Sequence, residues 1–120
     1  MRNGAGLSFA DAARCLADLG HPQRLEAFRL LVQAGETGLS VGDVERALKI
    51  PRSTLAHHLA QLVTSGLVTQ TREGRVQRCR VAARRTRALL SVLGDCCEGL
   101  PDLPDLPGTA ADGRGRGDGP

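Results

Sequence analysis

The sequence predicts a mainly α-helical domain with one small β-hairpin, in the order ααααββα that describes a winged helix-turn-helix. Four segments with helical periodicity come first, and only a short break separates the third from the fourth. Two segments that alternate apolar and polar residues follow, joined by a tight turn, and a fifth helical segment ends the pattern. Residues 46–94 carry ten basic residues and one acidic residue, whereas the whole chain has a formal net charge of only +3. A basic surface on this fold favours a polyanionic partner.

The four N-terminal helices are predicted from the residues that flank them. A capping Ser or a Pro in the first turn marks where a helix begins, and Gly or Pro marks where it ends. The expected helices are 8–19 after the cap Ser8, 22–34 between Pro22 and Gly35, a short helix between Ser40 and the Ile50-Pro51 pair, and 52–65 before Gly66.

Each of these helices carries apolar residues at helical spacing, and we expect the resulting stripe to face the core. The first stripe includes Phe9 and Leu16, and the second includes Leu25 and Val32. In the fourth helix the stripe includes Val63. The core built in this way is aliphatic, because the chain has only two aromatic residues, both Phe.

The C-terminal half of the domain is predicted to be a hairpin and a helix. Residues 67–72 and 75–81 alternate with a period of two, and a turn containing Glu73-Gly74 joins them. The helical period then returns over 82–97. This hairpin would be the wing of the fold.

The chain is expected to form one domain over residues 8–100, with a flexible N-terminus at 1–7. Residues 101–120 are rich in Pro, Gly and Asp and are expected to be disordered. A small aliphatic core favours a homodimer. Without an apolar run long enough to span a bilayer, and without a signal peptide, we expect no membrane contact and a cytoplasmic protein whose four cysteines are reduced.

Double-stranded DNA is the partner that the helix-turn-helix pattern predicts, because the second helix of the motif enters the major groove. Polar residues occupy the outer face of the predicted fourth helix, and basic residues flank the turn of the predicted wing. The expected DNA-binding residues are Arg52, Ser53, Thr54, His57 and Gln61 on the helix and Arg72, Arg75 and Arg78 on the wing.

The neighbouring histidine, His58, is interpreted differently from His57. His58 lies three residues after Leu55 and four before Leu62, on or beside the inner face of the helix. No second metal ligand occurs at helical spacing on that face, so a packed, hydrogen-bonded structural role is favoured over metal binding.

Several short motifs together resemble the ArsR (ArsR/SmtB) family of bacterial winged-helix repressors. The motifs are Leu19-Gly20-His21-Pro22-Gln23-Arg24-Leu25, Ser53-Thr54-Leu55-Ala56-His57-His58-Leu59, Gly66-Leu67-Val68 and Arg72-Glu73-Gly74-Arg75. The resemblance covers roughly residues 12–97. It implies a homodimer formed through the first and last helices, an operator as the DNA partner, and release when a metal or metalloid binds, with no permanently bound cofactor.

Departures from the family pattern reduce the number of inducers that this chain is expected to sense. The arsenic-sensing version of the third helix carries two cysteines where this chain has Ser40 and Gly42, and the last helix lacks the histidine of the zinc-sensing version. A further branch senses arsenite through an adjacent cysteine pair at the end of the last helix and a third cysteine six residues later. This chain has the pair, Cys96 and Cys97, but Leu103 at the third position.

The resemblance therefore implies arsenite, As(III), or a related thiophilic metalloid as inducer, bound by Cys96 and Cys97. Cys15 of either subunit is the candidate third ligand, because the first and last helices pack together in the family. Three alternatives remain open. They are a Cys96–Cys97 pair that binds the metalloid with an exogenous third ligand, a thiol-redox switch, and a repressor that senses no metal. As small hydrophobes, cysteines also commonly end an apolar helix simply by packing.

Other classes of function are less compatible with the sequence. The chain has no legible catalytic triad or phosphate-binding glycine loop, so we expect no enzyme. A winged helix used only for protein contacts is the alternative from another class. It would show no salt-sensitive DNA binding.

Overall fold

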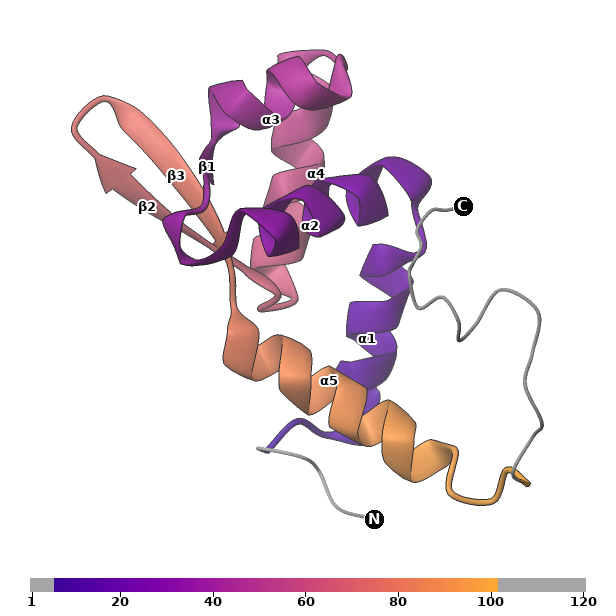
Figure 1. Ribbon diagram of the computed structural model, residues 1–120. Coiled ribbons are helices and arrows are strands. Elements are labelled where there is room, and N and C mark those ends of the chain that lie inside the picture. The colour runs from indigo at the N-terminus through magenta and orange to yellow at the C-terminus, as the bar shows by residue number, and fades with distance from the viewer. Residues whose placement is uncertain (1–5, 102–120) are drawn as a thin grey trace.

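The computed structural model of the chain describes residues 6–101 and has the predicted winged helix-turn-helix architecture (Figure 1). Five helices and a small sheet make up this part of the chain, and the sheet includes one short strand that the sequence did not predict. The expectations for residues 1–5 and 102–120 lie outside the described residues. The elements are α1 Phe9–Leu19, α2 Pro22–Ala34, the 3-10 turn η1 Gly35–Thr37, β1 Leu39–Ser40, α3 Val41–Leu48, α4 Arg52–Thr64, β2 Val68–Glu73, β3 Val76–Val81 and α5 Ala83–Cys96.

The helices begin at the capping residues that the sequence indicated. The Ser8 hydroxyl accepts a hydrogen bond from the Asp11 backbone N–H at 3.0 Å, which satisfies a free donor of α1. At α3, Ser40 and Asp43 form a reciprocal capping box with distances of 3.0 and 3.2 Å. These hydrogen bonds from Ser40 also lower the pKa of the Asp43 carboxyl. Local side-chain chemistry therefore fixes where α1 and α3 start.

The turn between α3 and α4 depends on one residue in an unusual conformation. Lys49 caps the C-terminus of α3 with φ 58° and ψ 44°, the left-handed region that an L-residue seldom adopts. Pro51 then occupies the N-cap of α4. The left-handed residue reverses the chain within a few positions, so α3 and α4 form the two helices of the helix-turn-helix.

The sheet is antiparallel with the strand order β1-β3-β2. In the hairpin, Glu73 pairs with Val76, so the turn consists of Gly74 and Arg75 and not of Glu73 and Gly74. Strand β1 contributes only Leu39 and Ser40 to the sheet. Two residues are too few to give a periodic pattern, which is why the sequence did not predict this strand.

One aliphatic core lies beneath α4, between the helices and the inner face of the sheet. Its fully buried members include Leu31, Val44, Leu55, Leu59, Leu62, Leu67, Val68, Cys79 and Val92. Leu7, expected in a flexible terminus, is only 1% exposed and belongs to this core. It precedes the N-cap Ser8, a position from which an apolar side chain commonly packs onto the first turns of a helix.

The predicted apolar stripes were wider than the faces that are buried. The stripe residues Phe9, Leu16, Leu25, Val32 and Val63 are all exposed in the single chain. Apolar spacing identifies the side of a helix but not how far the covering elements extend. Exposed apolar residues on α1 and α2 therefore remain available for other contacts.

Candidate nucleic-acid interface

Helix α4 presents a polar outer face while its other face anchors it in the core. Leu55, Leu59 and Leu62 are at most 1% exposed. Of the predicted contact residues, Arg52, Ser53 and His57 are exposed, whereas Thr54 and Gln61 are half-buried. The helix is therefore held rigidly on one side, and its N-terminal turn is accessible on the other.

Arg52 is exposed but already has a partner. Its Nε and one terminal nitrogen lie 2.8 and 2.7 Å from Glu45 Oε1 on α3. This ion pair links the two helices of the motif across their turn. A phosphate or guanine that binds Arg52 has to compete with the Glu45 carboxylate.

His58 connects α4 to the start of α2 and has the structural role predicted for it. The imidazole is 3% exposed. Its Nδ1 accepts a hydrogen bond from Arg24 Nε at 3.3 Å, and Nε2 lies 3.2 Å from Gln23 Oε1. Arg24 Nε can only donate, so His58 Nδ1 must be the acceptor. The ring proton therefore lies on Nε2, which donates to Gln23. The His21 ring lies 4.5 Å away, centroid to centroid.

We expect His58 to make the domain less stable in mild acid. Burial, followed by the charges of His21 and Arg24, lowers the pKa of His58 below its ordinary value of 6.5. The unfolded chain then takes up a proton more readily than the folded chain, so stability is lost as the pH falls below about 6.5. Urea denaturation at pH 7.5 and 5.5 measures this loss.

The control for that experiment is His58→Gln, which does not titrate but offers one donor and one acceptor in a similar place. Its loss of stability between the two pH values should be smaller than that of the native protein. Equal losses in both proteins would show that another group causes the acid sensitivity.

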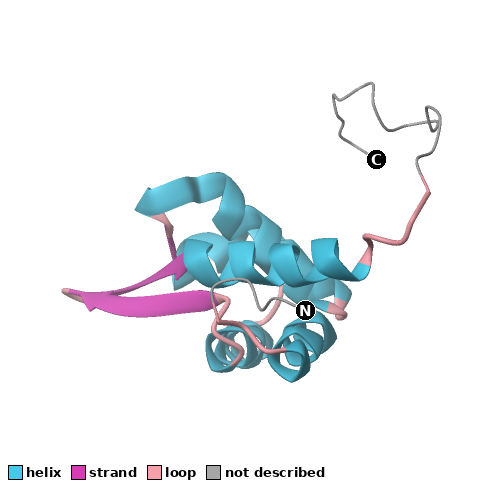
Figure 2. Ribbon diagram, turned by 90° about the horizontal axis from the view of Figure 1, so that it is seen from below, coloured by secondary structure: helices cyan, strands magenta, loops and turns pink. Residues whose placement is uncertain are grey.

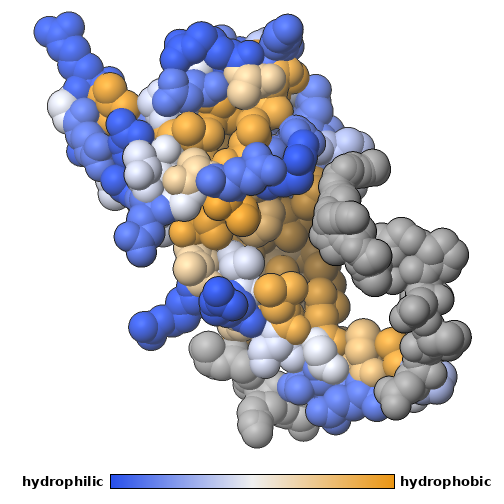
Figure 3. Space-filling view, viewed as in Figure 1, coloured by the Kyte–Doolittle hydropathy of each residue, from blue (hydrophilic) through white to orange (hydrophobic). Residues whose placement is uncertain are grey.

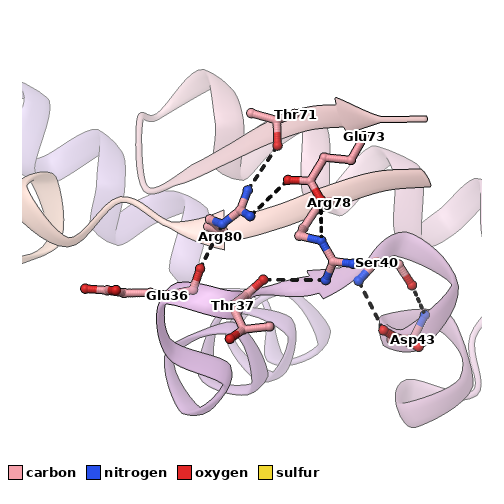
Figure 4. A network of polar contacts seen from close by, with 8 residues as sticks. All are labelled: Glu36, Thr37, Ser40, Asp43, Thr71, Glu73, Arg78 and Arg80. Carbon is pink, nitrogen blue, oxygen red and sulfur yellow. Dashed lines mark hydrogen bonds and ion pairs between the residues drawn. The ribbon is translucent and has the colours of Figure 1, made fainter. Parts of the chain in front are cut away.

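The wing contains an ionic network that the sequence did not predict (Figure 4). Glu73 at the end of β2 accepts from two arginines of β3, from Arg78 Nε at 2.9 Å and from Arg80 at 3.0 Å. These hydrogen bonds, that of Arg80 first, lower the pKa of the Glu73 carboxyl. The same arginines donate to the backbone carbonyls of Thr37 and Glu36, at 3.5 and 2.8 Å. The network therefore ties both wing strands to the segment after α2.

This network changes the interpretation of Arg78. The sequence predicts that Arg78 contacts DNA; its side chain is 25% exposed and pairs with Glu73, so a phosphate has to compete with that carboxylate. Its position is that of a brace within the wing. Arg72 and Arg75 differ, because both are exposed at the tip and form no ion pair or side-chain hydrogen bond within residues 6–101. Figure 2 shows the hairpin as a flat ribbon that extends away from the helices.

We expect Glu73→Gln to loosen the wing without unfolding the domain. The substitution keeps the shape of the side chain but removes the charge that holds Arg78 and Arg80. Backbone amides of β2 and β3 should exchange with solvent roughly two- to fivefold faster, as for the loss of an exposed ion pair. Hydrogen exchange followed by NMR measures this, with Glu26→Gln as control, because Glu26 pairs with Arg29 on α2, away from the wing. Unchanged exchange in the hairpin would mean that the network does not brace it.

The four cysteines fall into two groups. Cys15 and Cys79 are buried, and burial raises the pKa of both thiols. Cys79 accepts a hydrogen bond from the Gln70 amide at 3.4 Å and packs in the core. Cys96 and Cys97, at the end of α5, are both exposed. Within residues 6–101 of one chain, no three His, Cys, Asp or Glu side chains are grouped to hold a metal ion, so Cys15 of the same chain does not complete a site with the pair.

Cys15 instead takes part in a junction that the sequence did not indicate. Its Sγ donates to the Ser65 carbonyl oxygen at 3.4 Å, and Arg85 Nε donates to the same oxygen at 3.2 Å. Ser65 is the C-cap of α4, while Cys15 lies on α1 and Arg85 on α5. The end of α4 is thus bonded to both the first and the last helix.

Surfaces of α1 and α5 expose large apolar side chains. Phe9 and Leu16 on α1 are 61% and 41% exposed, and Leu90 on α5 is 59% exposed. Exposed apolar side chains of this size are typical of a binding surface. In the part of the chain that the structure describes, no helix is long and apolar enough to cross a membrane.

Comparisons with known proteins agree with this geometry. A family model described as "Helix-turn-helix domain" matches residues 19–71. A homodimeric winged helix-turn-helix DNA-binding domain from Mycobacterium bovis, described as a possible ArsR-family transcriptional regulator, is 31% identical with a TM-score of 0.58, over 72% of this chain and 80% of that chain. The transcriptional repressor BigR from Xylella fastidiosa is 31% identical with a TM-score of 0.55, over 71% and 85%. No curated protein matches the chain.

A third solved structure is also similar to this chain. It is described as a possible transcriptional regulator for arsenical resistance, and it is 25% identical with a TM-score of 0.61. The similarity covers 69% of this chain and 83% of that chain.

Proposed function

The chain belongs to the ArsR family of transcriptional regulators, and we propose that it is a homodimeric repressor that binds double-stranded operator DNA through α4 and the wing. One observation carries this proposal. The exposed N-terminal turn of α4 and the exposed arginines at the wing tip are the two parts of a winged helix that reach the major groove and the adjacent phosphates.

The two parts have different roles in this proposal. Ser53 and His57 on α4 are exposed, and in this proposal they contact base edges. Arg72 and Arg75 contact phosphates, which fixes the position of the wing but reads no sequence directly. Arg52 joins this surface by exchanging Glu45 for a phosphate.

The dimer is proposed to form through α1 and α5. The exposed Phe9 and Leu16 supply apolar surface on α1, and the M. bovis relative is described as homodimeric. A twofold dimer places two copies of α4 about one DNA turn apart, roughly 34 Å, so a small change in their separation weakens binding.

For the inducer we propose trivalent arsenic, bound by Cys96 and Cys97. Both thiols are exposed at the end of α5, and soft ions of this kind prefer sulfur ligands. In this proposal Cys96 and Cys97 supply two donors, and a third must come from elsewhere. Cys15 of the second subunit is a poor third donor, because it would have to give up burial and its bond to the Ser65 carbonyl. An exogenous thiol or water is therefore favoured as third ligand.

The proposed signal passes along α5. This helix follows directly from β3 of the wing, and Arg85 near its start bonds to the C-cap of α4. A ligand that rearranges the end of α5 in the dimer therefore acts on a helix that is connected both to the wing and to α4. A thiol-redox switch at the same pair uses the same route and is the second candidate.

Fluorescence anisotropy of the reduced protein on DNA from upstream of its own gene tests the proposal. Tight, salt-sensitive binding supports a DNA-binding repressor, and its absence from that DNA and from random duplexes overturns it. Release by stoichiometric arsenite that Cys96→Ser removes, and Cys15→Ala does not, supports the cysteine pair as the sensor.

Binding that ignores arsenite overturns the choice of inducer and leaves the repressor intact. Repeating the titration with hydrogen peroxide then distinguishes the redox alternative. Release that Cys96→Ser and Cys97→Ser both abolish would assign the pair to redox sensing. Indifference to both reagents would assign the pair to packing.

A further inference from the structure

A hollow of 440 Å³ lies where α2, the end of β3 and the start of α5 meet. Its volume falls within the range of small-molecule sites, about 300 to 1,000 Å³. The wall is mostly apolar and comes from three elements that are distant in the sequence. The apolar wall residues are Leu31, Val32, Val81, Ala83 and Leu90.

The rim of the hollow exposes apolar side chains that the fold does not cover. Val32 on α2 is 49% exposed and Leu90 on α5 is 59% exposed, whereas Leu31 at the bottom is fully buried. Figure 3 shows hydrophobic surface between the positions of α2 and α5 in Figure 1. A ligand with an apolar body would remove this surface from water, which is the main source of affinity in such sites.

The charged side chains around the hollow differ in how far they are engaged. Arg80 uses all three guanidinium nitrogens, with bonds to the Glu36 carbonyl, Thr71 and Glu73. Arg87 forms no ion pair or side-chain hydrogen bond within the described residues, and neither does the Glu36 carboxylate. Among the described residues, Arg87 is therefore the rim cation without a partner, and Glu36 is a carboxylate that opposes an anion there.

We propose that this hollow is a binding site for a small apolar molecule that carries one negative charge, such as an aromatic or short aliphatic acid. The apolar body lies against Leu31, Val81 and Leu90, and the acid group faces the Arg87 guanidinium. A charged hydrogen bond to arginine is stronger than one between neutral groups, so Arg87 selects anions over neutral molecules of the same shape. The site is separate from the DNA-binding surface and from the cysteine pair.

Two fluorescent probes with the same aromatic rings test this proposal without any DNA. 8-Anilinonaphthalene-1-sulfonate is an anion, and N-phenyl-1-naphthylamine is neutral. The full-length native protein is expected to bind one anionic probe per chain. Arg87→Ala should weaken binding of the anion roughly two- to fivefold, and Glu36→Gln should strengthen it, while both leave the neutral probe unchanged.

A filling variant locates the probes. Val32→Trp places a large side chain at the rim and is expected to lower the affinity for both probes at least tenfold. Leu25→Trp is the matched control, because Leu25 lies two turns earlier on α2, is 48% exposed and does not line the hollow. Circular dichroism confirms that both variants are folded.

Two results would overturn the site. The first is an absence of stoichiometric probe binding by the native protein, as expected if the second subunit covers the hollow. The second is equal binding by the Val32 and Leu25 variants, which would place the probes on scattered apolar surface. Because the readout needs no DNA, these outcomes do not depend on whether the chain is a repressor.

Discussion

Alanine in place of Gly38 is expected to lower the free energy of unfolding by about 3 kcal/mol or more. Gly38 has φ +69°, in the left-handed region where an L-side chain is strained. A Cβ atom there would also overlap the Cys79 carbonyl oxygen and come within 2.7 Å of Arg80 Cγ. The carbonyl belongs to the sheet backbone and cannot move without breaking the pairing of β1 with β3. Strain and overlap therefore add.

Gly74→Ala isolates the first of these two causes. Gly74 in the wing turn has φ +67°, but nothing lies within 4 Å of the position that a Cβ would take. Its substitution should cost about 1 kcal/mol, the price of the backbone conformation alone. Urea denaturation of both variants at one protein concentration measures the difference, since the stability of a dimer depends on concentration. Equal losses would show that the Cys79 carbonyl yields to the new methyl group.

The elements that the sequence predicted correctly are those specified by neighbouring residues. Ser8 and the Ser40–Asp43 pair cap helices through bonds that span only three residues. The apolar spacing of Leu55, Leu59 and Leu62 correctly assigned the inner face of α4. Such features can be read from the neighbouring residues, because the caps bond within one helical turn and the apolar spacing recurs along one helix.

The features that were missed depend on register and on distant contacts. The turn was placed one residue too early, which put Glu73 in the turn and hid that it shares a face with Arg78 and Arg80. The carbonyls of Glu36 and Thr37 that complete the network lie more than forty residues away in the chain. No local sequence pattern predicts a contact between residues so far apart in the chain. The sequence therefore suggested free arginines at positions where the fold pairs them.

The cysteines also show that contacts between distant residues could not be predicted from the sequence. Adjacency identified Cys96 and Cys97 as a pair, and the structure leaves both exposed. The burial of Cys15 and its bond to Ser65, fifty residues away, could not be predicted from the residues around it. The family resemblance made Cys15 a candidate ligand, whereas packing places it in the junction between α1 and α4.

Replacing both Arg72 and Arg75 with Ala should weaken DNA binding and also make it less sensitive to salt. These arginines are exposed at the wing tip, and they have no partner within the described residues that would compete with a phosphate. Each phosphate contact releases counterions and contributes about 0.9 to the slope of log affinity against log salt concentration. A dimer loses four such contacts, so the slope should fall by roughly 3 to 4.

The ratio of the two affinities should itself depend on salt concentration. The advantage of the native protein over the double variant should shrink roughly a hundredfold between about 50 mM and 200 mM salt, because four contacts at 0.9 each act over a fourfold change in concentration. Arg29→Ala is the control, since it removes an exposed arginine from α2, where Arg29 pairs with Glu26. Anisotropy titrations at several salt concentrations measure the slopes for all three proteins.

The same measurements would also distinguish the contribution of the wing to DNA binding from that of α4. Phosphate contacts carry no sequence information, so the double variant should lose affinity for operator and random DNA by similar factors. His57→Ala should do the opposite, lowering affinity for the operator more than for random DNA while leaving the salt slope nearly unchanged. An unchanged slope in the double variant would mean that the wing tip does not touch the backbone, and DNA binding would then have to rest on α4 and the paired arginines of β3 alone.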